Sequence, residues 1–310
     1  MDEERIKTFF KMKGCLEDDV SVINIGENCF LISSIDTLVV STDKPILMPW
    51  SSVGYKSIIA TLSDIAVKGG WPLSISLSMG LEKLSAVELE NLKMGILKAI
   101  DTYGLNKCFK WDTNKSRDPF LTVSSSALVR DYVPLRSGAK DGDLVCVGGD
   151  FGLNRVGLEA LLGVKRWDMK LDRNVYLDAI EVFCYPKPPL KEYVEFIQDA
   201  NPSSSIDSSD GLARSLNLIS KLSNIGIEIY DLPAHTHLVS NFSFDKLIDY
   251  VFYGGEEYIA IFTLEKKNSE LIDNYRFRII GRVTTGFRGV KVKYNGKSLI
   301  LKDDGFIHRF

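Results

Sequence analysis

The sequence predicts an α+β protein with α/β-type layers and two domains. Short apolar runs typical of buried strands alternate with longer stretches in which apolar residues recur at helical spacing. The chain has 310 residues, 45% of them hydrophobic, which is enough for two cores of about 150 residues each. Residues 134–143 are polar and contain two glycines, a composition typical of a linker. We therefore expect an N-terminal α/β domain over residues 1–134 and a C-terminal α+β domain over residues 135–310.

The composition argues against several classes of partner. With 38 basic and 41 acidic residues the net charge is −3, so the chain has no general attraction to nucleic acid or to an anionic membrane. No apolar run approaches the length of a membrane span, and the acidic start of the chain does not resemble a signal peptide. Five cysteines stand singly, without a CxxC pair, as in reduced proteins. We expect no nucleic-acid partner, no membrane partner and a cytoplasmic location.

The stretch over residues 36–70 is the most informative part of the chain. Residues 38–40 form a short apolar run, and Ser41, Thr42 and Asp43 follow it, which places oxygen ligands at the end of a predicted strand. From residue 55 the pattern becomes helical, with Asp64 on the more polar side. If this helix packs against the strand, Asp64 approaches Asp43. Two carboxylates about 4 Å apart repel by about 4 kcal/mol at an effective dielectric near 20, so such a pair needs a cation or a proton.

A simpler interpretation of these two aspartates stays open. Asp43 can be a turn residue before Pro45, and Asp64 can pair with Lys68 four residues later on the same helix.

The rest of the first half supplies further strands and a second helix. A long amphipathic helix is expected over residues 85–103, with Ser85 as its cap and Glu88 at the spacing of a capping box. Residues 110–119 are expected to form a polar loop that contains Asp112, and residues 120–130 a strand.

Two stretches of the second half carry polar groups beside glycines. Asp207 and Asp210 flank two serines at the start of a predicted helix. Hydroxyls, carboxylates and free amides at a helix start can hold a phosphate with its magnesium, although simple capping also explains them. Two glycines before Glu256 suggest close approach of the backbone to a ligand, and a hairpin turn explains them equally well. The glycine-rich turn over residues 148–152 matches no known phosphate-binding fingerprint.

Five motifs in this order resemble the thiamine-monophosphate kinase family, within the larger superfamily of aminoimidazole-ribonucleotide synthetase-like ATP enzymes. They are STD (41–43), LSDIA followed by KGG (62–70), RSGAKDGD (136–143), DSSDGL (207–212) and GGEEY (254–258). The resemblance runs from about residue 26 to the C-terminus. It implies a two-domain subunit whose N-terminal sheet pairs with its twin in a homodimer, with the nucleotide at the dimer interface. It also implies magnesium-dependent transfer of the γ-phosphoryl group of ATP to a small phosphate acceptor, thiamine monophosphate, giving thiamine diphosphate and ADP.

The resemblance also implies roles for particular residues. The positions that match magnesium ligands are Ser41, Thr42, Asp43, Asp64, Asp112, Asp207 and Asp210. The positions that match nucleotide contacts are Tyr103, Arg136 and Ser209, and those that match positions near the acceptor are Trp50, Glu256 and Phe306. No catalytic base is expected, because the attacking phosphate oxygen is already ionised at neutral pH.

The chain departs from the family pattern in three places. Residues 26–28 read Gly-Glu-Asn where the family has Gly-Asp-Asp, so that Asn28 replaces a carboxylate. Lys110 and Trp111 replace two glycines before Asp112, and Trp50 replaces a histidine. Two alternatives therefore stay open: a catalytically altered or inactive nucleotide-binding paralogue, and an enzyme of the superfamily with a different acceptor. The sequence does not fix the acceptor or the number of metal ions.

Overall fold

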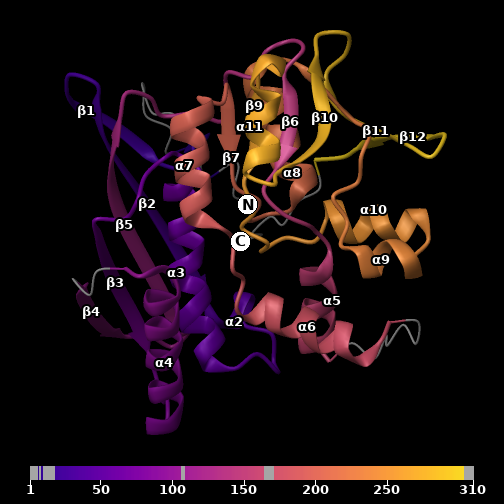
Figure 1. Ribbon diagram of the computed structural model, residues 1–310. Coiled ribbons are helices and arrows are strands. Elements are labelled where there is room, and N and C mark those ends of the chain that lie inside the picture. The colour runs from indigo at the N-terminus through magenta and orange to yellow at the C-terminus, as the bar shows by residue number, and fades with distance from the viewer. Residues whose placement is uncertain (1–5, 7, 10–17, 106–108, 164–170, 304–310) are drawn as a thin grey trace.

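The computed structural model describes residues 6, 8–9, 18–105, 109–163 and 171–303. In this part of the chain two β-sheets, one from each half of the sequence, are joined by a layer of helices (Figure 1). The prediction of an α+β fold with layers is confirmed.

The first sheet has the strand order β1-β2-β5-β3-β4. Its strands are β1 (Ser21–Gly26), β2 (Cys29–Val39), β3 (Ser74–Leu81), β4 (Phe109–Lys115) and β5 (Phe120–Arg130). Strand β4 pairs parallel to β3 at the edge of the sheet, whereas the other neighbouring pairs are antiparallel. The prediction of a polar loop over residues 110–119 was therefore wrong for residues 110–115. An edge strand exposed to solvent carries polar side chains without cost, so its composition resembles that of a loop.

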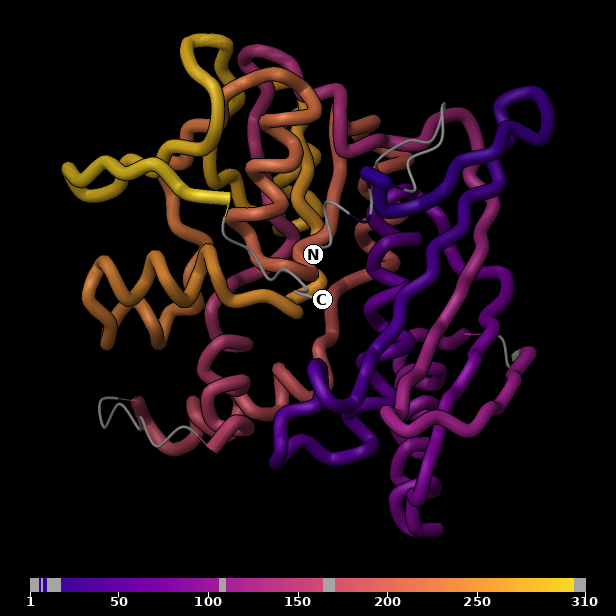
Figure 2. The backbone as a smooth tube through the Cα atoms, turned by 180° about the vertical axis from the view of Figure 1, so that it is seen from behind, coloured from indigo at the N-terminus to yellow at the C-terminus, as the bar shows by residue number. Residues whose placement is uncertain are grey.

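In the part of the chain that the structure describes, helices cover one face of this sheet. Helices α3 (Trp50–Ala66) and α4 (Ala86–Tyr103) lie between the sheet and the rest of the molecule (Figure 1), and the opposite face carries no helix in either view (Figures 1 and 2). The alternation along β2 follows from this arrangement: Ile32 is fully buried, whereas Ile35 is 67% exposed. The predicted capping box of α4 is present, because Ser85 and Glu88 bond each other's backbone amides.

Helices α3 and α4 cross unusually closely at two glycines. A Cβ atom on Gly95 would lie 1.8 Å from the carbonyl oxygen of Ser51, and one on Gly54 would lie 2.2 Å from that of Leu92. No side chain fits at either position without separation of the helices. Helix α3 lies in the interior, and most of its residues are buried.

The second sheet has the strand order β12-β11-β8-β10-β6-β9-β7. Its strands are β6 (Leu144–Val147), β7 (Ser204–Ile206), β8 (Gly226–Ile229), β9 (Ile261–Leu264), β10 (Arg278–Thr284), β11 (Gly289–Tyr294) and β12 (Lys297–Leu301). The remaining helices are α2 (Val40–Asp43), α5 (Leu153–Leu161), α6 (Arg173–Cys184), α7 (Leu190–Ala200), α8 (Leu212–Ser223), α9 (Thr236–Asn241), α10 (Phe244–Phe252) and α11 (Ser269–Asn274), with a 3₁₀ turn at Lys266–Asn268.

The two halves of the chain share a hydrophobic core. One continuous cluster of buried side chains includes Leu62 of α3, Phe196 of α7 and Phe262 of β9. The strands of the first sheet end at residue 130 and those of the second begin at residue 144. The domain boundary at 134/135 falls in the connection between them and stays a prediction. None of the helices in the described ranges is long and apolar enough to cross a membrane.

Candidate metal and nucleotide site

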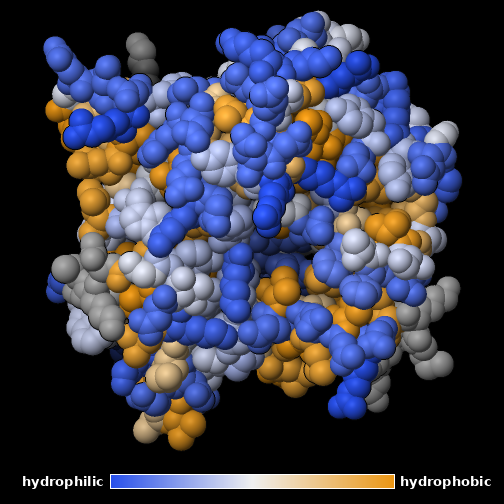
Figure 3. Space-filling view, in the orientation of Figure 1, coloured by the Kyte–Doolittle hydropathy of each residue, from blue (hydrophilic) through white to orange (hydrophobic). Residues whose placement is uncertain are grey.

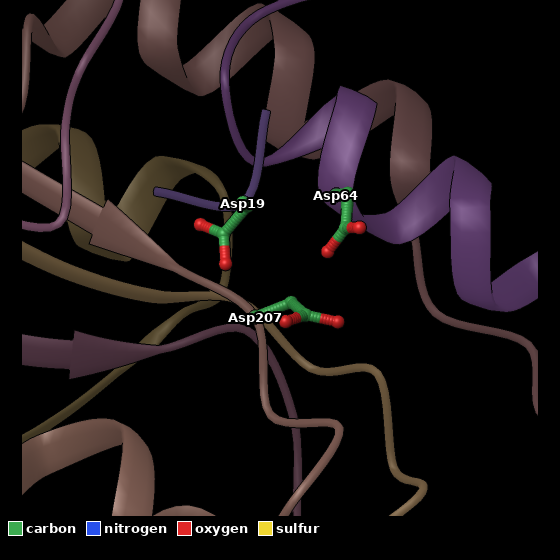
Figure 4. A group of neighbouring side chains, drawn as sticks. All are labelled: Asp19, Asp64 and Asp207. Carbon is green, nitrogen blue, oxygen red and sulfur yellow. The ribbon is translucent and has the colours of Figure 1, made fainter. Parts of the chain in front are cut away.

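Three carboxylates meet where the two halves of the chain come into contact. Each of Asp19, Asp64 and Asp207 offers an oxygen atom within 4.8 Å of the others. We call these three residues the acidic cluster. They come from the segment before β1, from α3 and from the loop after β7, and their side chains point toward a common space (Figure 4).

Serine hydroxyls fix two of the three carboxylates. The Ser34 hydroxyl on β2 donates to Asp64 Oδ2 at 2.6 Å, and the Ser63 hydroxyl on α3 donates to Asp207 Oδ2 at 2.7 Å. The Asp207 side chain follows directly after a fully buried strand and is 3% exposed. Strand β2, helix α3 and strand β7 therefore set the positions of the carboxylates before any ligand binds.

The acidic cluster holds more negative charge than its surroundings stabilise. Burial raises the pKa of Asp64 well above its ordinary value, and the charges of Asp36 and Asp207 add to the shift. Burial and the charge of Asp19 raise the pKa of Asp207 to about 8. Two carboxylate oxygens about 4.8 Å apart repel by about 3 kcal/mol at an effective dielectric near 20. The cluster therefore favours the uptake of a proton or a cation.

Asp19 differs from its two neighbours because cations already face both of its oxygens. Arg136 Nε donates to Oδ1 at 2.8 Å, and Lys68 Nζ lies 2.8 Å from Oδ2. Burial alone would raise the pKa of Asp19, but the charges of Lys68 and Arg136 hold it below its ordinary value. Asp19 is therefore ionised at neutral pH.

The donor set fits a hard divalent cation. The three side chains of the acidic cluster offer only oxygen, with no histidine or cysteine among them. Magnesium and similar ions prefer such oxygen ligands, and a divalent charge would offset the repulsion that raises the pKa values of Asp64 and Asp207.

The Asp43 carboxylate is held by the backbone of its own turn. Its Oδ2 accepts a hydrogen bond from the backbone N–H of Val39 at 2.7 Å. Burial raises the pKa of Tyr258, and the charges of Glu256, Asp36, Asp207 and Asp43 add to the shift. Helix α3 does pack against β2 as expected.

The two hydroxyls predicted beside Asp43 face other partners. The Ser41 hydroxyl donates to Asp118, and the Thr42 hydroxyl donates to the carbonyl oxygen of Val39 at 3.3 Å. Both residues are exposed in the short helix α2.

Asp112 does not join the acidic cluster within one chain. Asp112 pairs with Ser78 on the neighbouring strand, Ser78 pairs with Thr122, and Thr122 pairs with Thr37. Paired residues project from the same face of a sheet, and here that face carries no helix. Asp64 approaches the opposite face, where α3 packs. The sheet itself thus separates Asp112 from Asp64 and Asp207.

The predicted site residues Ser209, Asp210 and Glu256 lie in two loops that are joined by backbone hydrogen bonds. The N–H of Glu256 donates to the carbonyl oxygen of Ser209 at 2.7 Å, and that of Tyr258 donates to Ser208 at 3.0 Å. Asp210, next in the chain, pairs with Arg214 one turn later on α8, at 3.2 Å.

Glu256 has a fully buried cation as its partner. Its Oε1 lies 2.9 Å from Nζ of Lys56, a residue of α3 with no exposed surface, while the Glu256 side chain is 32% exposed. Its backbone has a positive φ of 60°, an uncommon conformation for a non-glycine residue. Phe306, predicted near the acceptor, lies outside the described residues.

Two other predicted contacts are engaged in packing. The hydroxyl of Tyr103, at the end of α4, donates to the carbonyl oxygen of Pro188 at 3.0 Å. Trp50 is the first residue of α3, and its indole N–H donates to Glu88 at 3.0 Å. Both side chains thus join helices of the core.

The structure places Asn28, the residue that departs from the family pattern, in a turn, and its part in metal binding stays a prediction. Residues 26–28 form the exposed turn between β1 and β2, and Asn28 has a positive φ of 51°. Within the described residues of this chain, the carboxylate that lies with Asp64 and Asp207 is Asp19, which was not predicted from the sequence. The signal was the acidic pair Asp18 and Asp19 directly before the apolar alternation of β1.

Restoring an acidic residue at the turn will therefore leave metal binding unchanged. We expect Asn28→Asp to bind Mn²⁺ with the affinity of the wild type, because the turn lies away from the acidic cluster. Calorimetric titration of both proteins checks this. A marked increase in affinity for the variant would show that the turn does face the metal.

Comparison with known proteins agrees with the fold. The family model described as AIR synthase related protein, N-terminal domain, matches residues 17–125. A thiamine-monophosphate kinase of Nitrosopumilus maritimus (strain SCM1) is 32% identical, with 99% of this chain and 98% of the relative aligned. One of Pyrococcus horikoshii is 34% identical over 94% of this chain and 90% of the relative.

Solved structures give the same result. A structure described as AaThiL complexed with AMPPCP and TMP superposes with a TM-score of 0.82 at 27% identity, covering 99% of this chain and 95% of that one. A chain of the HypE–HypF complex superposes at 0.77 with 19% identity, over 97% of this chain and 98% of that one, which shows a shared fold alone.

Fold and site together define an AIR synthase related protein with a carboxylate cluster between its two halves. Within that class, the chain belongs to the thiamine-monophosphate kinase family.

Proposed function

We propose that this protein transfers the γ-phosphoryl group of ATP to thiamine monophosphate, giving thiamine diphosphate and ADP, with Mg²⁺ as the metal. The observation that carries the proposal is the acidic cluster, in which oxygens of Asp19, Asp64 and Asp207 lie within 4.8 Å of one another. The relatives named thiamine-monophosphate kinase and the structure with AMPPCP and TMP support the choice of substrates.

In this proposal the acidic cluster holds magnesium, with Asp43 beside it. Bound there, magnesium supplies positive charge that offsets the charge developing on the phosphoryl oxygens. We keep Ser41, Thr42, Asp112 and Asp210 as further proposed ligands, and Tyr103, Arg136 and Ser209 as proposed nucleotide contacts. Arg136 suits that role because its side chain is 22% exposed while its partner Asp19 fixes the guanidinium.

Glu256 is the proposed acceptor contact. Thiamine carries a positively charged thiazolium ring, which a carboxylate recognises by charge. Lys56 holds one oxygen of Glu256 from the buried side, so the partly exposed carboxylate stays oriented. Trp50 and Phe306 remain proposed acceptor neighbours from the resemblance alone.

The chemical step needs no general base from the protein. A phosphate oxygen of thiamine monophosphate forms a new bond to the γ-phosphorus, and the bond from that phosphorus to the β,γ-bridging oxygen breaks, releasing ADP. The attacking oxygen is already ionised at neutral pH, so positioning and charge lower the barrier. This agrees with the absence of histidine from the acidic cluster.

A direct assay tests the proposal. Purified protein is incubated with ATP, thiamine monophosphate and MgCl₂, and thiamine diphosphate is separated and quantified. We expect turnover that EDTA abolishes. Failure to form the diphosphate at micromolar enzyme, with ADP release in the presence of another acceptor, would favour a different acceptor. No ADP release with any acceptor would favour an inactive paralogue.

We further propose a cytoplasmic homodimer that uses the bare face of the first sheet. Ile23 and Ile35 are 55% and 67% exposed, Leu128 is 46% exposed, and all three project from this face. Figure 3 shows apolar residues along this edge of the molecule, over β1, β2 and β5. A second copy seated there would remove this apolar surface from water, and Asp112 lies on the same face.

A charge on this face will separate the subunits. We expect the wild type to have the mass of a dimer in light scattering and Ile35→Asp to have that of a monomer, because the substitution places a charge in the interface. Ile300→Asp is the control, since Ile300 is 71% exposed on β12 of the other sheet. A monomeric wild type, or equal masses for the wild type and Ile35→Asp, contradicts the proposed interface.

A further inference from the structure

We propose that the ammonium group of Lys68 fills a cation position beside the acidic cluster that a divalent ion would otherwise occupy. Lys68 is then a permanent counterion that the protein itself supplies to the metal site. The inference rests on the proposed magnesium site and names a positioning residue for it. Lys68 is not one of the ligands predicted from the sequence, where its expected partner was Asp64.

The ammonium group lies in a cage made only of oxygen. Nζ is 2.7 Å from Asp18 Oδ1, 2.8 Å from Asp19 Oδ2 and 2.6 Å from the carbonyl oxygen of Ser205. Lys68 itself is fully buried, and the side chains of Asp18 and Asp19 are 3% and 0% exposed. Two carboxylates and a carbonyl are the donor types that hard divalent cations select.

One ammonium group thereby joins every segment that carries the acidic cluster. Lys68 follows Asp64 at the end of α3, contacts Asp19 directly, and reaches Ser205, two residues before Asp207. The Ser205 hydroxyl also donates to the carbonyl oxygen of Val67, which ties β7 to the same helix end. This contact thus links the three segments that carry the carboxylates.

The buried negative charge explains why the oxygen cage needs a cation. Asp18 and Asp19 are buried beside Asp64 and Asp207, and Arg136 is the other described cation in contact with them. An unpaired buried carboxylate is strongly destabilising. If Lys68 is removed and its space left open, a divalent cation can enter the oxygen cage; if the space is filled by an apolar side chain, it cannot.

Two substitutions separate these cases. Lys68→Ala opens the cage, and Lys68→Met removes the charge but fills the space with a chain of similar length. Lys56→Ala is the matched control, because Lys56 is an equally buried lysine of α3 that pairs with Glu256 outside the acidic cluster. Melting temperatures are measured by circular dichroism in EDTA and in millimolar MnCl₂, and Mn²⁺ stoichiometry is measured by calorimetry without ATP or acceptor.

We expect Lys68→Ala to melt at a lower temperature than the wild type in EDTA, to recover most of the difference in Mn²⁺, and to bind one more ion per chain. Lys68→Met and Lys56→Ala should be destabilised without this recovery and without the additional ion. If Lys68→Ala does not fold in EDTA, refolding in Mn²⁺ but not in EDTA supports the proposal.

Other outcomes overturn it. Equal Mn²⁺ stoichiometry in Lys68→Ala and the wild type, or equal recovery in Lys68→Ala and Lys68→Met, shows that Lys68 is only a structural ion-pair partner. The measurements do not depend on turnover. An inactive wild type with an additional ion in Lys68→Ala would refute the proposed kinase activity alone, and an active wild type without that ion would refute this inference alone.

Discussion

Asp207→Asn is expected to reduce turnover at least about a thousand-fold, which is about 4 kcal/mol in activation free energy. The substitution removes one unit of negative charge from the acidic cluster, which is the proposed magnesium site. The asparagine oxygen can still accept the hydrogen bond from Ser63, so packing around the side chain is preserved. The loss should therefore come from metal binding and charge, and steady-state kinetics at varied MgCl₂ measures it.

The same substitution should stabilise the metal-free protein at high pH. The folded-state pKa of Asp207 is raised to about 8, first by burial and then by Asp19. Between about pH 4 and about pH 8 the unfolded chain has lost this proton while the folded protein retains it, so wild-type stability falls as pH rises. Asparagine has no such dependence. In EDTA, Asp207→Asn should melt above the wild type at pH 8, and the difference should narrow by pH 5.

The control is Asp199→Asn, an exposed aspartate whose carboxylate accepts a hydrogen bond from Tyr275 far from the cluster. It should change neither turnover nor the pH dependence of melting. Full activity in Asp207→Asn would remove Asp207 from the metal site. A lower melting temperature than the wild type at pH 8 would show that the carboxylate is stabilised in the folded state without metal.

Gly95→Ala should cost the largest amount of stability of any single methyl addition in the first half. The new Cβ would lie 1.8 Å from the carbonyl oxygen of Ser51, which belongs to the backbone of α3 and cannot rotate away. Overpacking of this kind costs about 3 kcal/mol, and the better helix propensity of alanine returns about 1 kcal/mol. We expect a net loss of about 2 kcal/mol or more in the free energy of urea unfolding.

Asn91→Ala provides the comparison, since Asn91 lies on the exposed side of the same helix. It gains helix propensity without a new contact and should be neutral or slightly stabilising. Equal stability of Gly95→Ala and Asn91→Ala would mean that the two helices can separate at no cost. Gly54→Ala should resemble Gly95→Ala, because its Cβ meets the backbone of Leu92.

Local signals explain which parts of the fold could be predicted from the sequence. The helix over residues 85–103 was confirmed because its cap, its capping box and its periodicity all lie within its own residues. The strand over residues 120–130 was confirmed because apolar side chains mark a central strand. The edge strand β4 lacks a run of apolar side chains, because a strand exposed to solvent needs no apolar face.

The candidate site could be predicted only in part. The sequence indicated Asp64 and Asp207, which the fold brings together. It gave no indication that Lys68 faces Asp18 and Asp19, because that contact joins segments about fifty residues apart through the burial of all three side chains. A motif match also does not say which face of a sheet a side chain occupies, so the sequence could not place Asp112 on the face without helices, and its role as a ligand stays a prediction.

The backbone hydrogen bonds from Glu256 to Ser209 and from Tyr258 to Ser208 have a practical consequence for protein engineering. These hydrogen bonds join the backbones of the two loops. Substitutions that change the backbone of one loop would therefore break its hydrogen bonds to the other. A library designed to change substrate specificity should therefore vary both loops together.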